Sequence, residues 1–253
     1  MADGPLALPT DLVLARRQAG VGWLTLNNPA KRNAMTVAMW EAMAIAVAEF
    51  VADASIRLLV LHGAGGRSFA AGADIGEAER MRIEGRAEEY ARRTAAARAV
   101  LDTLEKPLIA MIDGHCIGGG LALALRADLR IASSASVFGV PAAKLGIAYA
   151  PWNLERLSAL VGPGFAKEML FTGDTFPAEI ALVRGLINRV VPAEALEAEV
   201  LALAVTIDQL AGDPAARDPA RLAELGRRCA ESEDITEGQR AFREKRPPVF
   251  QGR

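Results

Sequence analysis

The chain is poor in the residues that form disulfide frameworks and histidine-rich metal centres. Its 253 residues include only two cysteines, Cys116 and Cys229, and two histidines, His62 and His115. The cysteine spacing matches neither a disulfide framework nor a metal motif, and two histidines argue against a multi-histidine site. The sequence therefore favours a reducing compartment and predicts no metal site.

Long apolar runs and a strong charge imbalance are also missing. Charges or glycines interrupt the longest apolar segments before they reach the length of a membrane span. The opening segment MADGPLALPTDL lacks the basic and apolar regions of a signal peptide. The formal net charge of −2 gives no general electrostatic reason to bind nucleic acid or a membrane surface. We therefore expect a cytoplasmic protein that binds neither.

The apolar pattern alternates between short buried runs and longer amphipathic tracts as far as Pro192. Strands are expected over 12–15 and 21–26 (a hairpin), 56–62, 107–112, 129–132, 136–139 and 187–191. Helices are expected over 36–50 with Thr36 as the cap, 77–104 with a break at Gly85, and 118–126. This alternation predicts an α/β fold with largely parallel sheets. Only helical patterns follow, over 193–211, 219–230 and 236–244, so we expect a core of residues 1–192 and a helical region of residues 193–253.

The most informative stretch runs from Lys106 to Leu125 and reads KPLIAMIDGHCIGGGLALAL. Its apolar run predicts a buried strand, and the triplet Gly118–Gly120 opens a helix. A strand that turns through glycines into a helix leaves backbone N–H groups uncovered, and a developing anion is stabilised there. Close helix–sheet packing is the alternative explanation of the glycines. No carboxylate follows the triplet within this stretch.

A second loop of small residues, RSFAAGADI from Arg67 to Ile75, follows another predicted strand. Small side chains allow a ligand to approach backbone N–H groups, above all that of Ala73. The alternative is a tight turn in which Asp74 caps the next helix. Either loop alone is a weak signal, because glycine-rich turns are common.

Taken together and in order, these segments resemble the crotonase (enoyl-CoA hydratase/isomerase) superfamily. The matching segments are Leu24–Met35, Arg67–Ile75, Lys106–Gly120, Ala127–Ser133, Phe138–Ile147, Phe171–Pro192 and Glu237–Phe250. The resemblance implies a crotonase-like ββα spiral core with a C-terminal helical trimerisation region, assembled as a homotrimer or a hexamer (dimer of trimers). It also implies an acyl-CoA thioester as the partner, with coenzyme A entering as part of the substrate and no separate cofactor.

The resemblance assigns roles to particular positions. It implies that the backbone N–H groups of Ala73 and Gly119 form an oxyanion hole for a thioester enolate, where each donor contributes about 3 kcal/mol. It implies contacts to the CoA portion at Lys31, Arg32, Asn33, Ala34, Ala71, Asp74, Ile75 and Gly118. For Lys31 and Arg32, a solvated charged turn is the alternative to a phosphate contact.

The chain departs from the hydratase pattern at both catalytic glutamates. One glutamate of the family follows the glycine triplet by two positions, where this chain has Ala122. The other follows the proline of an FGxPE-like motif, where this chain has Ala142. Because alanine cannot transfer a proton, the sequence predicts that classical hydration is weak or absent.

Tyr149 indicates another route to an enolate. Its place after Leu145–Ile147 resembles that of a tyrosine in the methylmalonyl-CoA decarboxylase branch, although that branch carries a histidine at the place of Ala73. Decarboxylation forms the enolate without removal of a proton, so decarboxylation of a malonyl-type acyl-CoA is favoured. A half-buried tyrosine that binds the backbone is the other interpretation of Tyr149.

Two further functions stay open at this point. Glu77 follows the first loop and would serve as a substitute acid for hydratase or isomerase chemistry. A protein that binds acyl-CoA without turning it over would keep the two backbone N–H groups as binding features only.

Overall fold

The computed structural model describes residues 3–210, 227–228 and 230–249. The chain divides into two compact units, Met1–Leu210 and Ala211–Arg253. The first unit extends the predicted core of residues 1–192 by the helix α8 (Leu196–Leu210), whose apolar face packs on the main sheet. The predicted helix over 219–230 lies almost entirely outside the described residues.

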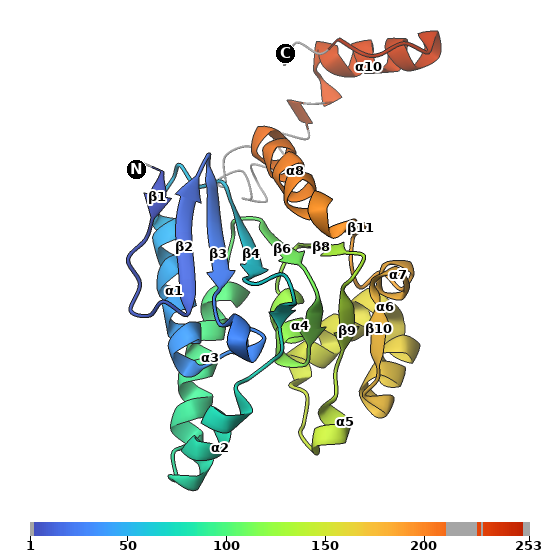
Figure 1. Cartoon of the computed structure of the whole chain (residues 1–253). Helices are drawn as coiled ribbons and strands as arrows, with labels where there is room; N and C mark the ends of the chain where they lie inside the picture. The colour runs from blue at the N-terminus through green and yellow to red at the C-terminus, as the bar shows by residue number, and fades with distance from the viewer. Residues whose placement is uncertain (1–2, 211–226, 229, 250–253) are drawn as a thin grey trace. The chain divides into compact units, whose positions relative to one another are not determined.

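The main sheet has seven strands in the order β1-β2-β3-β4-β6-β8-β11 (Figure 1). Their bounds are β1 Gly4–Pro5, β2 Val13–Gln18, β3 Val21–Leu26, β4 Leu58–Gly63, β6 Leu108–Ile112, β8 Leu129–Ser133 and β11 Arg189–Val191. The first three strands pair antiparallel, and from β3 onward every neighbouring pair is parallel. The predicted N-terminal hairpin and the largely parallel α/β sheet are therefore confirmed.

A smaller sheet has the order β10-β9-β7-β5. Its strands are β5 Ser68–Ala70, β7 His115–Ile117, β9 Val137–Gly139 and β10 Thr175–Pro177. The sequence analysis did not predict β5 and β7, because Ser68–Ala70 lies within the predicted loop Arg67–Ile75 and His115–Ile117 lies between a predicted strand and the glycine triplet. These two strands pair in parallel, with Ser68 opposite His115. The loops that follow them therefore leave the sheet side by side.

The described helices belong mostly to the first unit, and one belongs to the second. Their bounds are α1 Val37–Ala52, α2 Ile75–Ile83, α3 Ala87–Asp102, α4 Gly119–Ala124, α5 Ala142–Leu145, α6 Pro151–Thr172, α7 Ala178–Val183 and, in the second unit, α10 Glu233–Glu244, with short 3-10 turns at Pro29–Lys31 and Ala193–Ala195. Thr36 caps α1, since its hydroxyl accepts the Met39 N–H at 3.2 Å. Gly85 has a φ of +72° between α2 and α3, so the predicted break is confirmed.

Alternation along the central strands divides the core between the two faces of the main sheet. On β3, Leu24 belongs to the larger apolar cluster, together with Phe50 of α1. The neighbouring Trp23 belongs to the other cluster, together with Val200 of α8. Successive side chains of a strand point to opposite faces, so α1 and α8 cover different faces of one sheet. None of the described helices has both the length and the apolarity that a membrane span requires.

Candidate active site

Two backbone amides meet where the loops after β5 and β7 run side by side. A Cβ placed on Gly119 would lie 3.3 Å from the Ala73 nitrogen. The Met35 N–H donates to Gly72 O at 2.7 Å, and the Asp74 N–H donates to Met35 O at 3.0 Å. Neither of these bonds uses the Ala73 N–H. Gly119 is the first residue of α4, so the Gly119 N–H has no acceptor within that helix. Within the described part of the chain, neither N–H donates to a protein acceptor.

The glycine triplet is required by backbone geometry at this point. Gly118 has φ 56° and ψ −115°, a conformation that residues with a Cβ avoid. A Cβ on Gly120 would lie 2.1 Å from Ala70 O, so only glycine lets α4 approach β5 this closely. The packing explanation of the triplet is therefore correct for Gly120. Gly119, in contrast, lines the cavity that is described next.

A cavity of about 330 Å³ adjoins the two amides. Ala73, Gly119 and Tyr149 line it, and so do Ala122 and Ala142, which come from α4 and α5. Its other walls include Trp40, Ala71, Gly72, Ile75, Tyr90, Arg98, Gly118, Arg126, Val140, Pro141, Leu145, Ile147, Trp152 and Asn153. Among the described residues, its lining contains no Asp, Glu or His. The lining is mainly apolar, with two arginines and two tyrosines as its ionisable groups.

Tyr149 borders the cavity and also lies beside the backbone. It lines the cavity, and its hydroxyl lies 3.5 Å from Gly118 O at the start of α4. Burial raises the pKa of Tyr149 well above its usual range. The hydroxyl is therefore protonated at neutral pH and acts as a hydrogen-bond donor in the cavity rather than as a base.

Glu77 does not reach the cavity. Its carboxylate accepts the Val37 N–H at 2.8 Å, the first N–H of α1, where a negative charge is favoured. Glu79, the next acid on α2, forms a long, exposed ion pair with Arg82. The structure thus brings neither carboxylate beside the Ala73 and Gly119 amides.

The predicted CoA-contacting residues come from the turn around Lys31 and from the loops that follow β5 and β7. Lys31 Nζ lies 2.7 Å from Asp74 Oδ2, and the Ala71 N–H donates to Arg32 O at 3.0 Å. Asp74 caps α2 by accepting the Glu77 N–H at 3.0 Å, so its predicted capping role is confirmed. Among these residues, Ala71, Ile75 and Gly118 line the cavity itself.

Asn33 holds this cluster together from inside. Its side chain is fully buried and its φ is +56°. The Asn33 amide accepts the Asn28 N–H at 2.9 Å and donates to Ala64 O at 3.0 Å and to Ser68 O at 2.7 Å. One side chain therefore links the turn that contains Lys31 to the strand that precedes Ala71.

Substitution of Asp74 by asparagine should give a pH-dependent loss of stability. The hydrogen bond from Lys31, aided by the Glu77 N–H, holds the pKa of Asp74 below its ordinary value. A lowered folded-state pKa means that the carboxylate stabilises the fold above its unfolded-state pKa and loses this effect as the pH falls. The difference in unfolding free energy between the wild type and Asp74→Asn should therefore be largest near neutral pH and shrink below about pH 4.

Urea unfolding at several pH values measures this difference. In a Lys31→Met background, which removes the main cause of the shift, the Asp74→Asn difference should be smaller at neutral pH. A difference that is the same at every pH would contradict the assignment.

Several cavity residues escaped the sequence reasoning. Tyr90 and Arg98 come from α3, and Arg126 follows α4. Tyr90, the buried Thr94 and Arg98 recur every four residues and so share one face of the helix. That spacing was visible in the sequence, but only the packing of α3 shows that this face borders the cavity.

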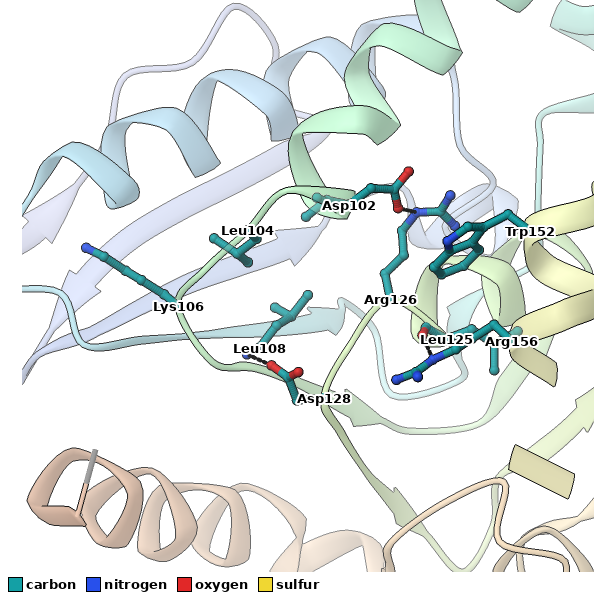
Figure 2. Close-up of a pocket in the computed structure, with 10 residues that line it drawn as sticks. Asp102, Leu104, Lys106, Leu108, Leu125, Arg126, Asp128, Trp152 and Arg156 are labelled. Atoms are coloured by element: carbon teal, nitrogen blue, oxygen red, sulfur yellow. Dashed lines mark hydrogen bonds and ion pairs between the residues drawn. The ribbon is translucent and has the colours of Figure 1, made fainter. Parts of the chain in front are cut away.

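Arg126 stands between this cavity and a second pocket of about 270 Å³. Figure 2 shows the Arg126 side chain close to both the Asp102 carboxylate and the Trp152 indole. Arg126 Nε lies 2.8 Å from Asp102 Oδ1, without the alignment of a hydrogen bond, and the guanidinium lies 4.3 Å from the Trp152 ring centre. Arg156 lines only the second pocket, and its Nε donates to Leu125 O at 3.3 Å.

The family model described as enoyl-CoA hydratase/isomerase matches residues 16–217. The chain belongs to the enoyl-CoA hydratase/isomerase family. A short-chain-enoyl-CoA hydratase of Clostridium acetobutylicum is 39% identical over 180 residues, which cover 71% of this chain and 68% of that protein. A crotonyl-CoA hydratase of Syntrophomonas wolfei is 33% identical and is matched over 94% of this chain and 97% of its own length.

Solved structures of the enoyl-CoA hydratase/isomerase family share this fold. An enoyl-CoA hydratase/carnithine racemase from Magnetospirillum magneticum superposes with a TM-score of 0.76 at 34% identity, over 97% of each chain. The predicted α/β crotonase fold is therefore confirmed. We interpret the cavity described above by the acyl-CoA chemistry of this family.

Proposed function

We propose that this family member stabilises the enolate of an acyl-CoA thioester and that its preferred reaction is decarboxylation of a malonyl-type acyl-CoA. The N–H groups of Ala73 and Gly119 form the oxyanion hole. Both residues line one cavity, their backbones are closely packed, and neither N–H has a protein acceptor among the described residues. Fixed donors of this kind need no reorganisation when charge develops on the thioester oxygen.

The observation that carries the choice of reaction is the lining at Ala122 and Ala142. Both alanines line the cavity. By the sequence resemblance, they stand where hydratases carry their glutamates. Hydration needs one group to activate water and one to donate a proton, and alanine does neither. Classical hydration is therefore weak or absent in this proposal.

Decarboxylation requires less of the protein. The bond between the α-carbon and the carboxylate breaks, carbon dioxide leaves, and the electron pair moves into the enolate, whose oxygen binds the two N–H groups. The α-carbon then takes one proton, from water or from the Tyr149 hydroxyl, which is protonated at neutral pH.

The CoA portion is held, in this proposal, by the loop residues Lys31 to Ala34 and by Ala71, Asp74 and Ile75. Lys31 already binds Asp74, so a CoA phosphate would add a second anion to a cation that is largely exposed. The assembly is proposed to be a homotrimer or a dimer of trimers in the cytoplasm.

Two substrates separate the candidate reactions. With malonyl-CoA or methylmalonyl-CoA we expect release of carbon dioxide, and with crotonyl-CoA little or no water addition. A Tyr149→Phe variant should lose roughly tenfold or more of the decarboxylation rate, since general acid–base groups contribute about 10²–10⁴-fold, while it keeps its affinity for the thioester.

Other outcomes would select the alternatives. Robust hydration of crotonyl-CoA would contradict the inference from Ala122 and Ala142 and would favour a hydratase or isomerase with a substitute acid. Binding of every thioester without turnover would favour a non-catalytic acyl-CoA-binding protein.

A further inference from the structure

The cavity that adjoins the Ala73 and Gly119 amides has two cations in its wall. Arg98 and Arg126 both line it, and the described lining contains no carboxylate. Each guanidinium lies over a tryptophan that also lines the cavity, Arg98 at 5.6 Å from the Trp40 ring centre and Arg126 at 4.3 Å from that of Trp152. A guanidinium within about 6 Å of an aromatic ring centre is attracted by the ring's negative face, and this attraction uses none of its N–H donors.

Arg126 is already neutralised. Its side chain is almost fully buried, Asp102 forms an ion pair with it, and its Nη1 donates to Ala122 O at 2.8 Å. Asn153 Oδ1 accepts a further, longer bond at 3.4 Å. Arg126 is thus held by α3, α4 and α6 together, and its charge is matched by that of Asp102.

Arg98 is different. Among the described residues, no carboxylate forms an ion pair with it and no acceptor forms a hydrogen bond with its guanidinium. Burial lowers the pKa of Arg98, and repulsion from Arg126 lowers it further. A half-buried guanidinium with five donors and no protein acceptor among the described residues is available to bind an anion in the cavity. The set of Arg98, Arg126 and Asp102 therefore carries one uncompensated positive charge at the cavity wall.

We propose that the cavity accepts an acyl group that itself carries a carboxylate, and that Arg98 is the residue that binds it. This inference rests on the proposed acyl-CoA function of the same cavity and names the residue that binds the free carboxylate of a dicarboxylic acid thioester. Trp40 lies within cation–π distance of Arg98, and the Arg98 N–H groups bind the carboxylate in the paired geometry that guanidinium groups favour. Neutral acyl chains leave the cation uncompensated.

Arg98 contributes to binding rather than to bond cleavage. In decarboxylation, negative charge moves from the carboxylate to the thioester oxygen, so a cation beside the carboxylate favours the ground state at least as much as the transition state. Equilibrium affinity is therefore the quantity that tests the proposal.

Calorimetric titration of the whole protein with malonyl-, succinyl-, glutaryl- and butyryl-CoA provides the test. At least one carboxylated thioester should bind more tightly than butyryl-CoA, and Arg98→Met should weaken that thioester by roughly tenfold to a hundredfold, the range for hydrogen bonds to charged groups. Butyryl-CoA affinity should change by less than about twofold, which also shows that the variant is folded. The chain length with the largest effect shows how far the carboxylate lies from the thioester.

Arg92→Met is the matched control, because Arg92 is an exposed arginine on the same helix that does not line this cavity. It should leave all four affinities unchanged. Equal affinities for carboxylated and neutral thioesters, or a preference that survives in Arg98→Met, would overturn the proposal. Carbon dioxide release is followed in the same samples, so failure of decarboxylation is seen separately from failure of carboxylate binding.

Discussion

Replacement of Gly119 by proline should lower kcat/KM for decarboxylation by about 10²–10³-fold, the effect of removing one oxyanion-hole donor. Proline has no N–H, and it is tolerated at the first position of a helix, which Gly119 occupies in α4. The substitution therefore removes the donor without an inherent conflict with the helix. Carbon dioxide release from malonyl-CoA or methylmalonyl-CoA measures the effect.

Gly119→Ala is the matched control for the added side chain. Its Cβ would lie 3.2 Å from Gly72 Cα and 3.3 Å from the Ala73 nitrogen, so the neighbours must shift by a few tenths of an ångström. The N–H is retained, and we expect a loss of about tenfold or less, equivalent to about 1.4 kcal/mol. Similar losses in both variants would mean that the space around Gly119, and not its N–H group, is what turnover requires.

Replacement of Asn33 by alanine should lower the free energy of unfolding by roughly 2–4 kcal/mol. The substitution leaves the buried Ser68 O and the partly buried Asn28 N–H and Ala64 O without this partner, at about 1–3 kcal/mol in all. It also places alanine at a φ of +56°, which costs a further 1–2 kcal/mol or so. Urea unfolding followed by circular dichroism gives the free energy directly.

Asn27→Ala supplies the comparison, since the Asn27 amide also donates to a backbone carbonyl, that of Asp11, but in an exposed position. We expect a loss of about 1 kcal/mol or less there. Asn33→Ala should in addition weaken binding of CoA thioesters, because it frees the turn that contains Lys31. A stability loss no larger than that of Asn27→Ala would show that Asn33 does not hold the loops together.

The regular elements were predictable where periodicity or a cap was strong. Thr36 marked the start of α1, and Gly85 marked the break between α2 and α3. The short strands β5 and β7 were not predictable, because three residues pair only when a partner strand is already in place. The role of Asn33 was also hidden, because its side-chain partners Ala64 and Ser68 are more than thirty residues away in sequence.

Some residues of the candidate site were likewise predictable from the sequence, and others were not. The glycines and small residues of its two loops were visible, since the backbone there needs particular residues. Tyr90 and Arg98 were not singled out, because a helix face says nothing by itself about which surface it borders. The position of Glu77 was ambiguous in sequence, and the structure decides it through the bond from the Val37 N–H.

The sequence by itself determined the family, the paired loops with Ala73 and Gly119, and the alanines at positions 122 and 142. These are properties of residue type, and alanine has no titratable group wherever it lies. Tertiary structure alone decided that Arg98 and Arg126 share a cavity with those loops and that Asp102 forms an ion pair with Arg126 and not with Arg98. The charge of a cavity is a sum over side chains from distant segments, so it is defined only once the chain has folded.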